Sequence, residues 1–323
     1  RVPVPDSRIN KLSEIGKSEK IIPTYIDFVD IAGLVKGAST GEGLGNKFLA
    51  HIREVDAIAH VVRCFEDENI THVSSTIDPL DDIETITTEL KLADLETLQN
   101  KLSSLEKKSK NGDKEIKIQI DLILILQKKL NNDETIKGIE LDKDEIIFYN
   151  SLNLISAKPM LYICNVDENS ALKGNKFSKL VENKARSEGN NIVIVSAAIE
   201  SQIAEFDNES DKLELLKDLG LKETTLKKVI NAGYKILNLI TYFTCGPKET
   251  RAWTIGMKTT APKAAGKIHT DFEKGFIRAE TISYNDFIEF NGESASREAG
   301  KLRQEGKEYI VKDGDVMHFL FNV

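Results

Sequence analysis

Phe28-Val29-Asp30-Ile31-Ala32-Gly33-Leu34 is an apolar run that ends in Asp-x-x-Gly. P-loop nucleotidases place this pattern at the tip of a strand beneath the γ-phosphate. There the aspartate can hold Mg²⁺ through water, and the glycine lets a backbone N–H approach the phosphate. Asp-x-x-Gly alone also occurs in surface turns without a ligand. The segment that follows favours a nucleotide-sensing switch loop, because it carries Gly37, Gly41, Gly43 and Gly45.

Leu34 stands where Ras-like enzymes have a glutamine that orients the attacking water. A leucine side chain neither donates nor accepts a hydrogen bond. If this chain hydrolyses a nucleotide, another group must position the water.

The composition limits the class of protein. With 323 residues and 40% hydrophobic content, the chain can bury a sizeable core in two or three domains. Its net charge of -8 argues against a generally basic nucleic-acid coat, and we expect no DNA partner. No apolar run approaches the roughly 18–20 residues of a membrane span. The three cysteines form no CxxC pair, which favours reduced thiols in a cytoplasmic protein.

A phosphate-cradling loop needs the pattern G-x-x-x-x-G-K-[ST]. The nearest match is Gly16-Lys17-Ser18, but Lys11 stands where the first glycine is needed. The preceding residues 9–15 also have the pattern of an amphipathic helix rather than the required strand. We therefore interpret this match as a decoy with an exposed lysine.

Alternating apolar and helical patterns predict an α/β domain. Strands are expected at residues 24–30, 57–65, 159–164 and 191–195, with a helix at 175–188. Between them, leucines and isoleucines spaced by three and four residues after Pro79 predict a long helix with a coiled-coil-like seam. A break at 111–113 and a second helix at 114–130 complete a helical hairpin inserted in the domain.

Loops at the carboxyl ends of the predicted strands lie where doubly wound sheets bind ligands. Asn165 and Glu168 form Asn-x-x-Glu, whereas guanine-selective sites use Asn-Lys-x-Asp. Glu168 is one methylene longer than aspartate, and Val166 replaces the lysine. Adenine, or relaxed specificity, becomes plausible.

The last part of the chain has the pattern of a small α+β domain of the β-grasp kind, including a helix expected at 296–304. Between Thr241 and Thr270, five lysine or arginine residues oppose one glutamate, with Tyr242, Phe243 and Trp253 interleaved. This pattern fits an RNA-facing surface or, equally, a solvated face above core aromatics.

These residues together resemble the Obg-like ATPases of the YchF type over essentially the whole chain. The resemblance rests on long, ordered matches at residues 28–48, 60–66, 78–83, 196–200, 251–254, 269–280 and 313–316. It implies a P-loop-type nucleotide-binding domain at 1–78 and 151–240, a helical hairpin insertion at 79–150, and a C-terminal TGS-like β-grasp domain at 241–323. It also implies a preference for ATP, a Mg²⁺ cofactor, and association with the ribosome, its large subunit and ribosomal RNA.

The resemblance also implies roles for individual residues. Asp30 and Gly33 fall on the family's magnesium and γ-phosphate switch. His72 matches a loop histidine used in hydrolysis, and an imidazole suits water positioning where no glutamine exists. The base side comprises Asn165, Val166 and Glu168, together with Ser196 and Ala197 in a second loop.

The chain departs from the family pattern at its start, where a strand, a G-x-x-N-x-G-K-S/T loop and a helix would precede Arg1. We expect that this segment is missing from the chain, and that the 323 residues alone are inactive. The main alternatives are a non-catalytic ribosome- or RNA-binding module and a GTPase of the Obg class.

Overall fold

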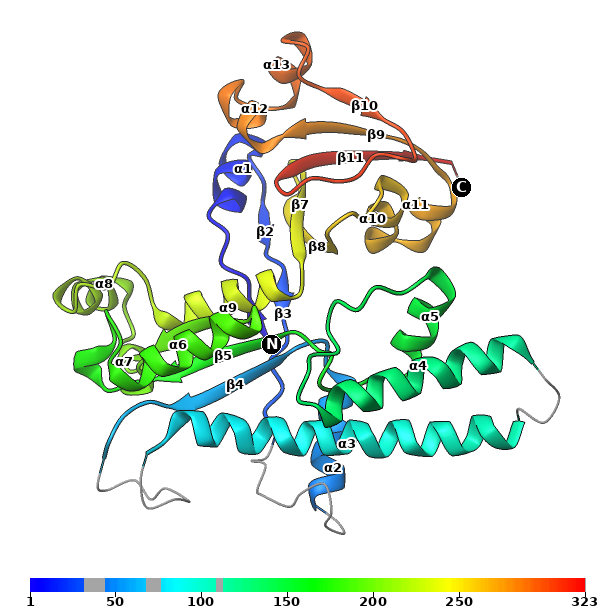
Figure 1. Cartoon of the computed structure of the whole chain (residues 1–323). Coiled ribbons are helices and arrows are strands. Elements are labelled where there is room, and N and C mark those ends of the chain that lie inside the picture. The colour runs from blue at the N-terminus through cyan, green and yellow to red at the C-terminus, as the bar shows by residue number, and fades with distance from the viewer. Residues whose placement is uncertain (32–43, 68–76, 109–112, 323) are drawn as a thin grey trace. The chain divides into compact units, whose positions relative to one another are not determined.

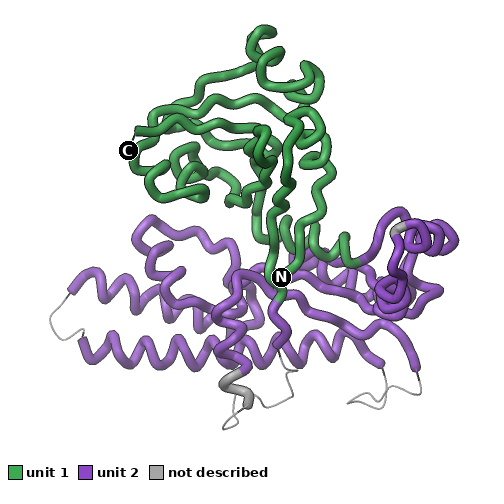
Figure 2. Tube along the Cα trace, turned by 180° about the vertical axis from the view of Figure 1, so that it is seen from behind, with its two compact units in different colours: residues 1–28, 226–323 green, residues 29–225 purple. Residues whose placement is uncertain are grey.

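The computed structural model describes residues 1–31, 44–67, 77–108 and 113–322 (Figure 1). These residues form two compact units (Figure 2). Unit 1 comprises residues 1–28 and 226–323, and unit 2 comprises residues 29–225. Among the described residues, no helix is both long and apolar enough to cross a membrane.

Unit 2 is built on a parallel sheet in the order β4-β5-β6, comprising β4 (Ile58–Arg63), β5 (Met160–Asn165) and β6 (Asn191–Val195). The central strand β5 buries four consecutive side chains, as expected for a parallel strand covered on both faces. Val181 and Ala185 of α6 (Lys176–Glu188) pack against this sheet in one hydrophobic cluster. The other helices here are α2 (Leu44–Glu54), α7 (Ala197–Ala204), α8 (Glu209–Asp218) and the 3₁₀ turn η2 (Glu168–Ser170).

The predicted helical hairpin is confirmed. It consists of α3 (Pro79–Lys108) and α4 (Lys114–Asn131), followed by α5 (Lys143–Ser151). The seam predicted on α3 packs against α4 in one buried cluster that includes Leu98, Leu102, Leu105, Leu122, Ile123, Leu126 and Leu130.

A buried carboxylate attaches the hairpin to the segment that leads into β5. Asp94 of α3 is fully buried and accepts hydrogen bonds from the N–H groups of Ile155 and Ser156, at 2.9 and 2.7 Å. The Ser156 hydroxyl donates a third at 2.6 Å. Burial raises the pKa of Asp94, and the three donors act in the opposite direction.

Unit 1 contains a six-stranded mixed sheet in the order β10-β9-β11-β7-β8-β2. Its strands are β2 (Lys20–Ile22), β7 (Leu239–Cys245), β8 (Glu249–Gly256), β9 (Phe276–Ser283), β10 (Arg303–Glu305) and β11 (Asp315–Phe321). Helices α10 (Ala261–Ile268) and α11 (Thr270–Lys274) pack on one face. Helix α1 (Arg8–Gly16) packs on the other. Three helices, α9 (Thr225–Ile236), α12 (Tyr284–Glu289) and α13 (Glu293–Glu298), and a short hairpin of β1 (Val2–Pro3) with β3 (Tyr25–Ile26) complete the unit.

The predicted domain limits differ from these units at the start of the chain. Residues 1–28 were expected with the nucleotide-binding domain, but they belong to the same compact unit as residues 226–323. Strand β2 pairs in parallel with β8, and Ile9 and Leu12 of α1 pack against Phe243 in one cluster. Arg8 also forms an ion pair with Asp313 at 2.7 Å.

Two predicted elements are shorter than expected. The strand predicted at 24–30 is paired only at Tyr25 and Ile26, and Phe28 and Val29 are 40% and 60% exposed. The helix predicted at 296–304 ends at Glu298, because Gly300 takes a left-handed φ of 71° and β10 begins three residues later.

Candidate nucleotide-binding site

The carboxyl ends of β4, β5 and β6 meet at one edge of the unit 2 sheet, because the three strands are parallel and in register. Loops at such an edge form the ligand-binding crevice of open α/β sheets. The chain leaves this edge at Cys64 after β4, at Val166 after β5 and at Ser196 after β6.

One side-chain hydrogen bond joins the two loops predicted to hold the base. The carboxamide oxygen of Asn165 accepts the N–H of Ala197 at 3.1 Å. Beneath it, the N–H of Val166 donates to the carbonyl of Val195 at 2.8 Å. The Asn165 and Ser196-Ala197 segments therefore form one structural unit, although Asn165 and Ala197 are 32 residues apart in sequence.

Glu168 is also fixed in place. Its carboxylate accepts a hydrogen bond from Nε2 of Gln202 in α7 at 2.8 Å. Sequence reasoning missed Gln202, since no motif marks it; only the helical spacing from Ser196 would have placed it near the loop. The side chain of Val166 is 2% exposed and packs in the sheet core, so only its backbone is available to a ligand.

Ser196 carries an unusual polar group. The residue is fully buried, it precedes α7, and its hydroxyl has no hydrogen-bond partner among the described residues. A buried polar atom without a partner is costly in a folded protein. A ligand polar atom beside this loop would remove that cost.

The side chain of Asn175 links the loop after β4 to the loop after β5. Its side chain caps α6 by accepting the N–H groups of Phe177 and Ser178, and its Nδ2 donates to the carbonyl of Cys64 at 2.7 Å. Nearby, the Ser170 hydroxyl donates to Asp167 at 2.7 Å, which with the other hydrogen bonds to this carboxyl lowers the pKa of Asp167. The capping pattern at Asn175 was a signal that sequence reasoning did not use.

The phosphate side of the predicted site is described only in part. Asp30 is exposed, on an irregular segment after β3. Gly33, Leu34 and His72 lie outside the described residues. Within the described ranges, no cluster of three or more His, Cys, Asp or Glu side chains could hold a metal ion.

Gly16-Lys17-Ser18 lies in unit 1 and closes a helix instead of opening one. Lys17 ends α1 in the left-handed conformation and is exposed. The Ser18 hydroxyl donates to the carbonyl of Gly246 at 2.7 Å. A phosphate-binding loop requires a helix N-terminus at this point, so the interpretation as a decoy is confirmed.

The mid-strand position of His60 on β4 predicts a core histidine with satisfied nitrogens. Its ring lies 5.8 Å from that of Tyr162, and Nδ1 is buried without a hydrogen-bond partner among the described residues. Burial lowers the pKa of His60 to about 4. The side chain of His60 is therefore half-buried rather than part of the core, and one of its nitrogens has no hydrogen-bond partner among the described residues.

The chain was compared with known protein families and structures. Residues 239–322 match the YchF GTPase C-terminal family, described as a protein of unknown function (DUF933). Residues 9–128 match a family described as 50S ribosome-binding GTPase.

Proteins named ribosome-binding ATPase YchF are similar over the whole chain and 88% of their own length. The identities are 57% for Haemophilus influenzae, 53% for Escherichia coli O157:H7 and 47% for Bacillus subtilis. The solved structure of the Schizosaccharomyces pombe YchF GTPase has a TM-score of 0.88 and 39% identity, covering 99% of this chain and 86% of that one.

Proposed function

The chain belongs to the YchF family, with an α/β P-loop GTPase-type domain, a helical insertion and a C-terminal TGS-like domain. From this premise we propose that it binds and hydrolyses ATP and binds the ribosome. The relatives named above carry that activity in their names. A cytoplasmic location follows from a ribosomal partner.

The observation that supports nucleotide binding best is the hydrogen bond from Ala197 to Asn165. It aligns the two base-side loops before any ligand arrives, so a base can bind without first ordering them.

The residues of the Asn-x-x-Glu motif support adenine over guanine. The carboxylate of Glu168 accepts a hydrogen bond from Gln202. Guanine recognition instead needs an aspartate that accepts hydrogen bonds from the base. Val166 supplies no charged side chain. We therefore assign ATP as the substrate.

Hydrolysis needs groups on the phosphate side, and the family pattern assigns three. Asp30 is the candidate Mg²⁺ ligand, since its exposed carboxylate is the oxygen donor that Mg²⁺ takes, with water and nucleotide phosphates completing the shell. Bound there, Mg²⁺ would neutralise charge on the phosphates. Gly33 would present a backbone N–H, and His72 would orient the water that Leu34 cannot.

A direct test uses two polypeptides. One is residues 1–323. The other, the loop-bearing polypeptide, joins the family's G-x-x-N-x-G-K-S/T segment to Arg1. Since residues 1–323 contain no such motif, we expect them alone neither to bind Mg-ATP with micromolar affinity nor to hydrolyse it. The loop-bearing polypeptide should do both and should co-sediment with ribosomes.

Calorimetry, phosphate release and sedimentation measure these outcomes. Ribosome binding without nucleotide binding in the loop-bearing polypeptide would favour the non-catalytic module instead. A tenfold preference for GTP, about 1.4 kcal/mol, would favour an Obg-class GTPase.

A further inference from the structure

Helix α2 is the first helix after Asp30 and the Gly-rich segment, residues 32–43, that follows it. It packs across α3, the first helix of the hairpin (Figure 1). The buried residues that the two helices contribute to this contact are Leu49, Ile52, Leu90 and Ala93. Ile31, the residue directly after Asp30, packs against the same cluster. The described residues on both sides of the Gly-rich segment therefore contact the base of the hairpin.

Arg53 fastens the last turn of α2 to α3 by hydrogen bonds. Its Nη2 donates to the hydroxyl of Thr97 at 2.7 Å and to the carbonyl of Ala93 at 3.3 Å. The Thr97 hydroxyl in turn donates to the same carbonyl at 2.9 Å. Apolar packing between the two helices is not directional, whereas a guanidinium presents its donors in a fixed planar geometry. The arginine therefore fixes the orientation of α2 on α3.

The backbone at the end of α2 is held as well. The carbonyl of Arg53 accepts hydrogen bonds from Nζ of Lys158 at 2.7 Å and from Nδ2 of Asn153 at 3.0 Å. These donors satisfy a carbonyl that a helix leaves without a partner at its C-terminus. Both residues belong to the segment before β5, the segment that Asp94 of α3 also binds. One junction thus joins α2, α3 and the approach to the central strand.

Helix α3 extends these contacts into the hairpin. It is a single helix of 30 residues, and Ala93 and Thr97 lie near its middle. Beyond them, Leu98, Leu102 and Leu105 belong to the cluster that packs α3 against α4. A continuous helix is a rigid element that can carry coupling between two sites. The placement of α2 therefore depends on the hairpin.

We propose that Arg53 is a positioning residue for ATP hydrolysis. It fixes α2 on α3 and so sets one end of the segment that carries Gly33, while Ile31 sets the other end. The proposed contact from the Gly33 N–H to the γ-phosphate requires close placement, and a shift of about 1 Å can cost about a hundredfold in rate. The guanidinium itself is engaged with α3, so it acts through the backbone of α2. The inference rests on the proposed hydrolysis and gives the hairpin a part in it.

The test measures turnover and ATP affinity of the loop-bearing polypeptide by phosphate release and calorimetry. Arg53→Met removes the donors and keeps a long side chain, and Arg53→Lys returns a flexible cationic donor. Thr97→Val removes the hydroxyl acceptor at nearly constant volume. The double variant of Arg53→Met with Thr97→Val reports whether the two side chains act through one contact.

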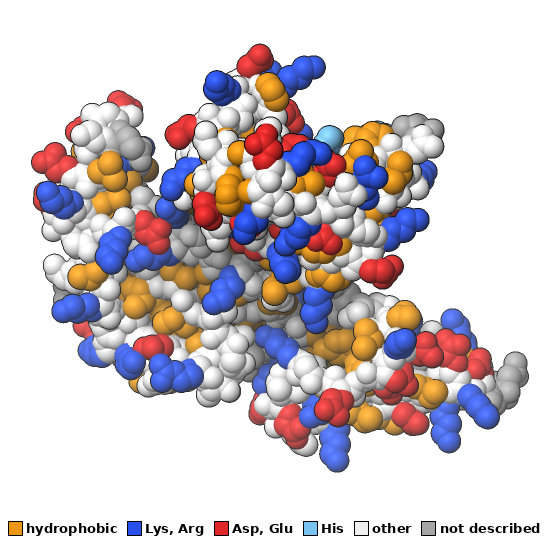
Figure 3. Space-filling model, turned by 90° about the horizontal axis from the view of Figure 1, so that it is seen from above, with side chains coloured by type: hydrophobic (Ala, Val, Ile, Leu, Met, Phe, Trp, Pro, Cys, Tyr) orange, Lys and Arg blue, Asp and Glu red, His pale blue; other side chains and the backbone are white. Residues whose placement is uncertain are grey.

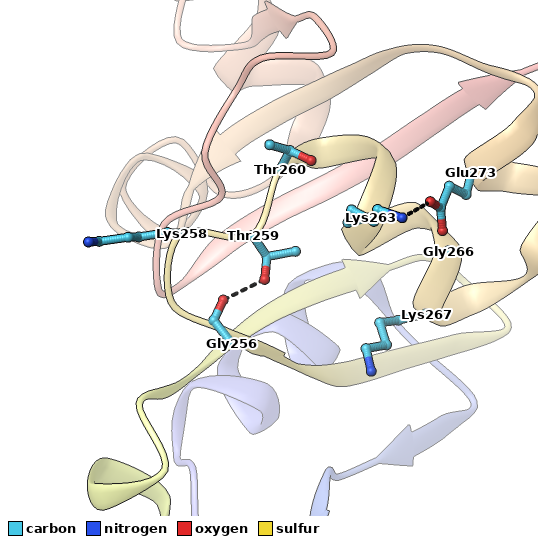
Figure 4. A pocket seen from close by; sticks show the side chains of 8 residues that line it. All are labelled: Gly256, Lys258, Thr259, Thr260, Lys263, Gly266, Lys267 and Glu273. Atoms are coloured by element: carbon cyan, nitrogen blue, oxygen red, sulfur yellow. Dashed lines mark hydrogen bonds and ion pairs between the residues drawn. The ribbon is translucent and has the colours of Figure 1, made fainter. Parts of the chain in front are cut away.

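Two controls separate positioning from charge and from stability. Lys263→Met removes a cation that joins two helices in unit 1, where it pairs with Glu273 at 2.5 Å (Figure 4). Acidic and basic side chains are interspersed on the face in Figure 3, so this pair represents an ordinary surface contact. Ile123→Val destabilises the fully buried α3–α4 cluster, to which α2 contributes no residue.

Arg53→Met should lower kcat about tenfold and leave the Kd for ATP within about twofold, since the contact acts on the transition state. Arg53→Lys should recover kcat to within about threefold of wild type, and the double variant should lose no more than Arg53→Met. Both controls should keep kcat within about twofold of wild type. In residues 1–323, Arg53→Met should also speed hydrogen exchange of the α2 amides.

Three results would overturn the inference: normal kcat in Arg53→Met, an equal loss in Ile123→Val, or losses that multiply in the double variant. If Arg53→Met does not fold, Thr97→Val decides, because it keeps the packing and should lower kcat about threefold. If the wild-type loop-bearing polypeptide releases no phosphate, the proposed function fails and the inference fails with it. If wild type and Arg53→Met hydrolyse ATP equally fast, the inference alone fails.

Discussion

Asn165 accepts a hydrogen bond from the backbone N–H of Ala197 at 3.1 Å, and this bond joins the ends of two neighbouring strands. Asn165→Ala should therefore loosen the base-side loops without affecting the core. In the loop-bearing polypeptide, we expect the Kd for ATP to rise about tenfold, or about 1.4 kcal/mol. Calorimetry measures this, with the exposed helical substitution Asn100→Ala as control. Unchanged affinity would separate Asn165 from the nucleotide site.

Glu168 is the residue on which base choice is proposed to depend. Glu168→Asp shortens the side chain and brings it to the length used in guanine recognition, at the expense of the hydrogen bond from Gln202. We expect the ratio of GTP to ATP affinity to rise about tenfold, measured by competition between the two nucleotides. Glu205→Asp, at the end of α7, is the matched control. A ratio that does not move would assign base choice to another group.

His72 is proposed to position the attacking water, since Leu34 cannot. His72→Ala in the loop-bearing polypeptide should lower kcat about a hundredfold and leave ATP affinity unchanged, which is the signature of a contact made mainly in the transition state. The exposed His318→Ala serves as control. Normal turnover in His72→Ala would remove this histidine from the mechanism.

Asp94 connects the helical hairpin to the segment before β5 through three donors. In Asp94→Asn an NH₂ group replaces one of the two carboxylate oxygens. At least one of the buried donors of Ile155 and Ser156 then loses its acceptor. The free energy of unfolding should fall by about 2–3 kcal/mol, measured by urea denaturation of unit 2 helicity. Asp121→Asn on α4, where the side chain is exposed, should change it by less than about 0.5 kcal/mol. Equal midpoints for the two variants would contradict this role.

His60 should make stability depend on pH. Its folded-state pKa of about 4 lies below the ordinary value near 6.5, so the unfolded chain binds more protons between these values. The stability contributed by neutral His60 is present above pH 6.5 and is lost as the pH falls toward 4. Between pH 7 and 5 the loss should be about 2 kcal/mol.

His60→Leu tests this dependence, because leucine cannot titrate. Urea titrations of wild type and variant at pH 7 and 5 isolate the histidine, since all other groups are common to both proteins. If wild type and His60→Leu lose the same free energy of unfolding between pH 7 and 5, burial does not lower the pKa of His60 in the folded protein.

The sequence predicted most of unit 2 because its signals are local. A buried parallel strand such as β5 has a continuous apolar run, and the α3–α4 seam repeats every three or four residues. Strand-end positions predicted only that loops at this edge bind a ligand; the base-side roles of Asn165, Val166, Glu168, Ser196 and Ala197 came from the family resemblance and stay predictions. Helix α5 was missed, although Asp142 and Glu145 form a capping box there that could have predicted it.

Other features depend on contacts between distant residues. No local pattern shows that Lys20–Ile22 pairs with β8, or that Arg8 meets Asp313 across 305 positions. The strand expected at 24–30 was too long because apolar residues are not sufficient for a strand: Phe28 and Val29 are not paired in the described part of the chain. The contact of Gln202 with Glu168 also depends on where α7 lies, although helical spacing from Ser196 could have placed Gln202 near the loop.

The position of β11 has a consequence for biosynthesis. It lies between β9 and β7 in the sheet, yet it is translated after every other strand of that sheet. During synthesis, β7 and β9 therefore leave the ribosome with unpaired edges, which are sites of unwanted strand addition. Unit 1 can complete its sheet only once residues 315–321 have emerged from the ribosome, and until then the facing edges of β7 and β9 stay open to such addition.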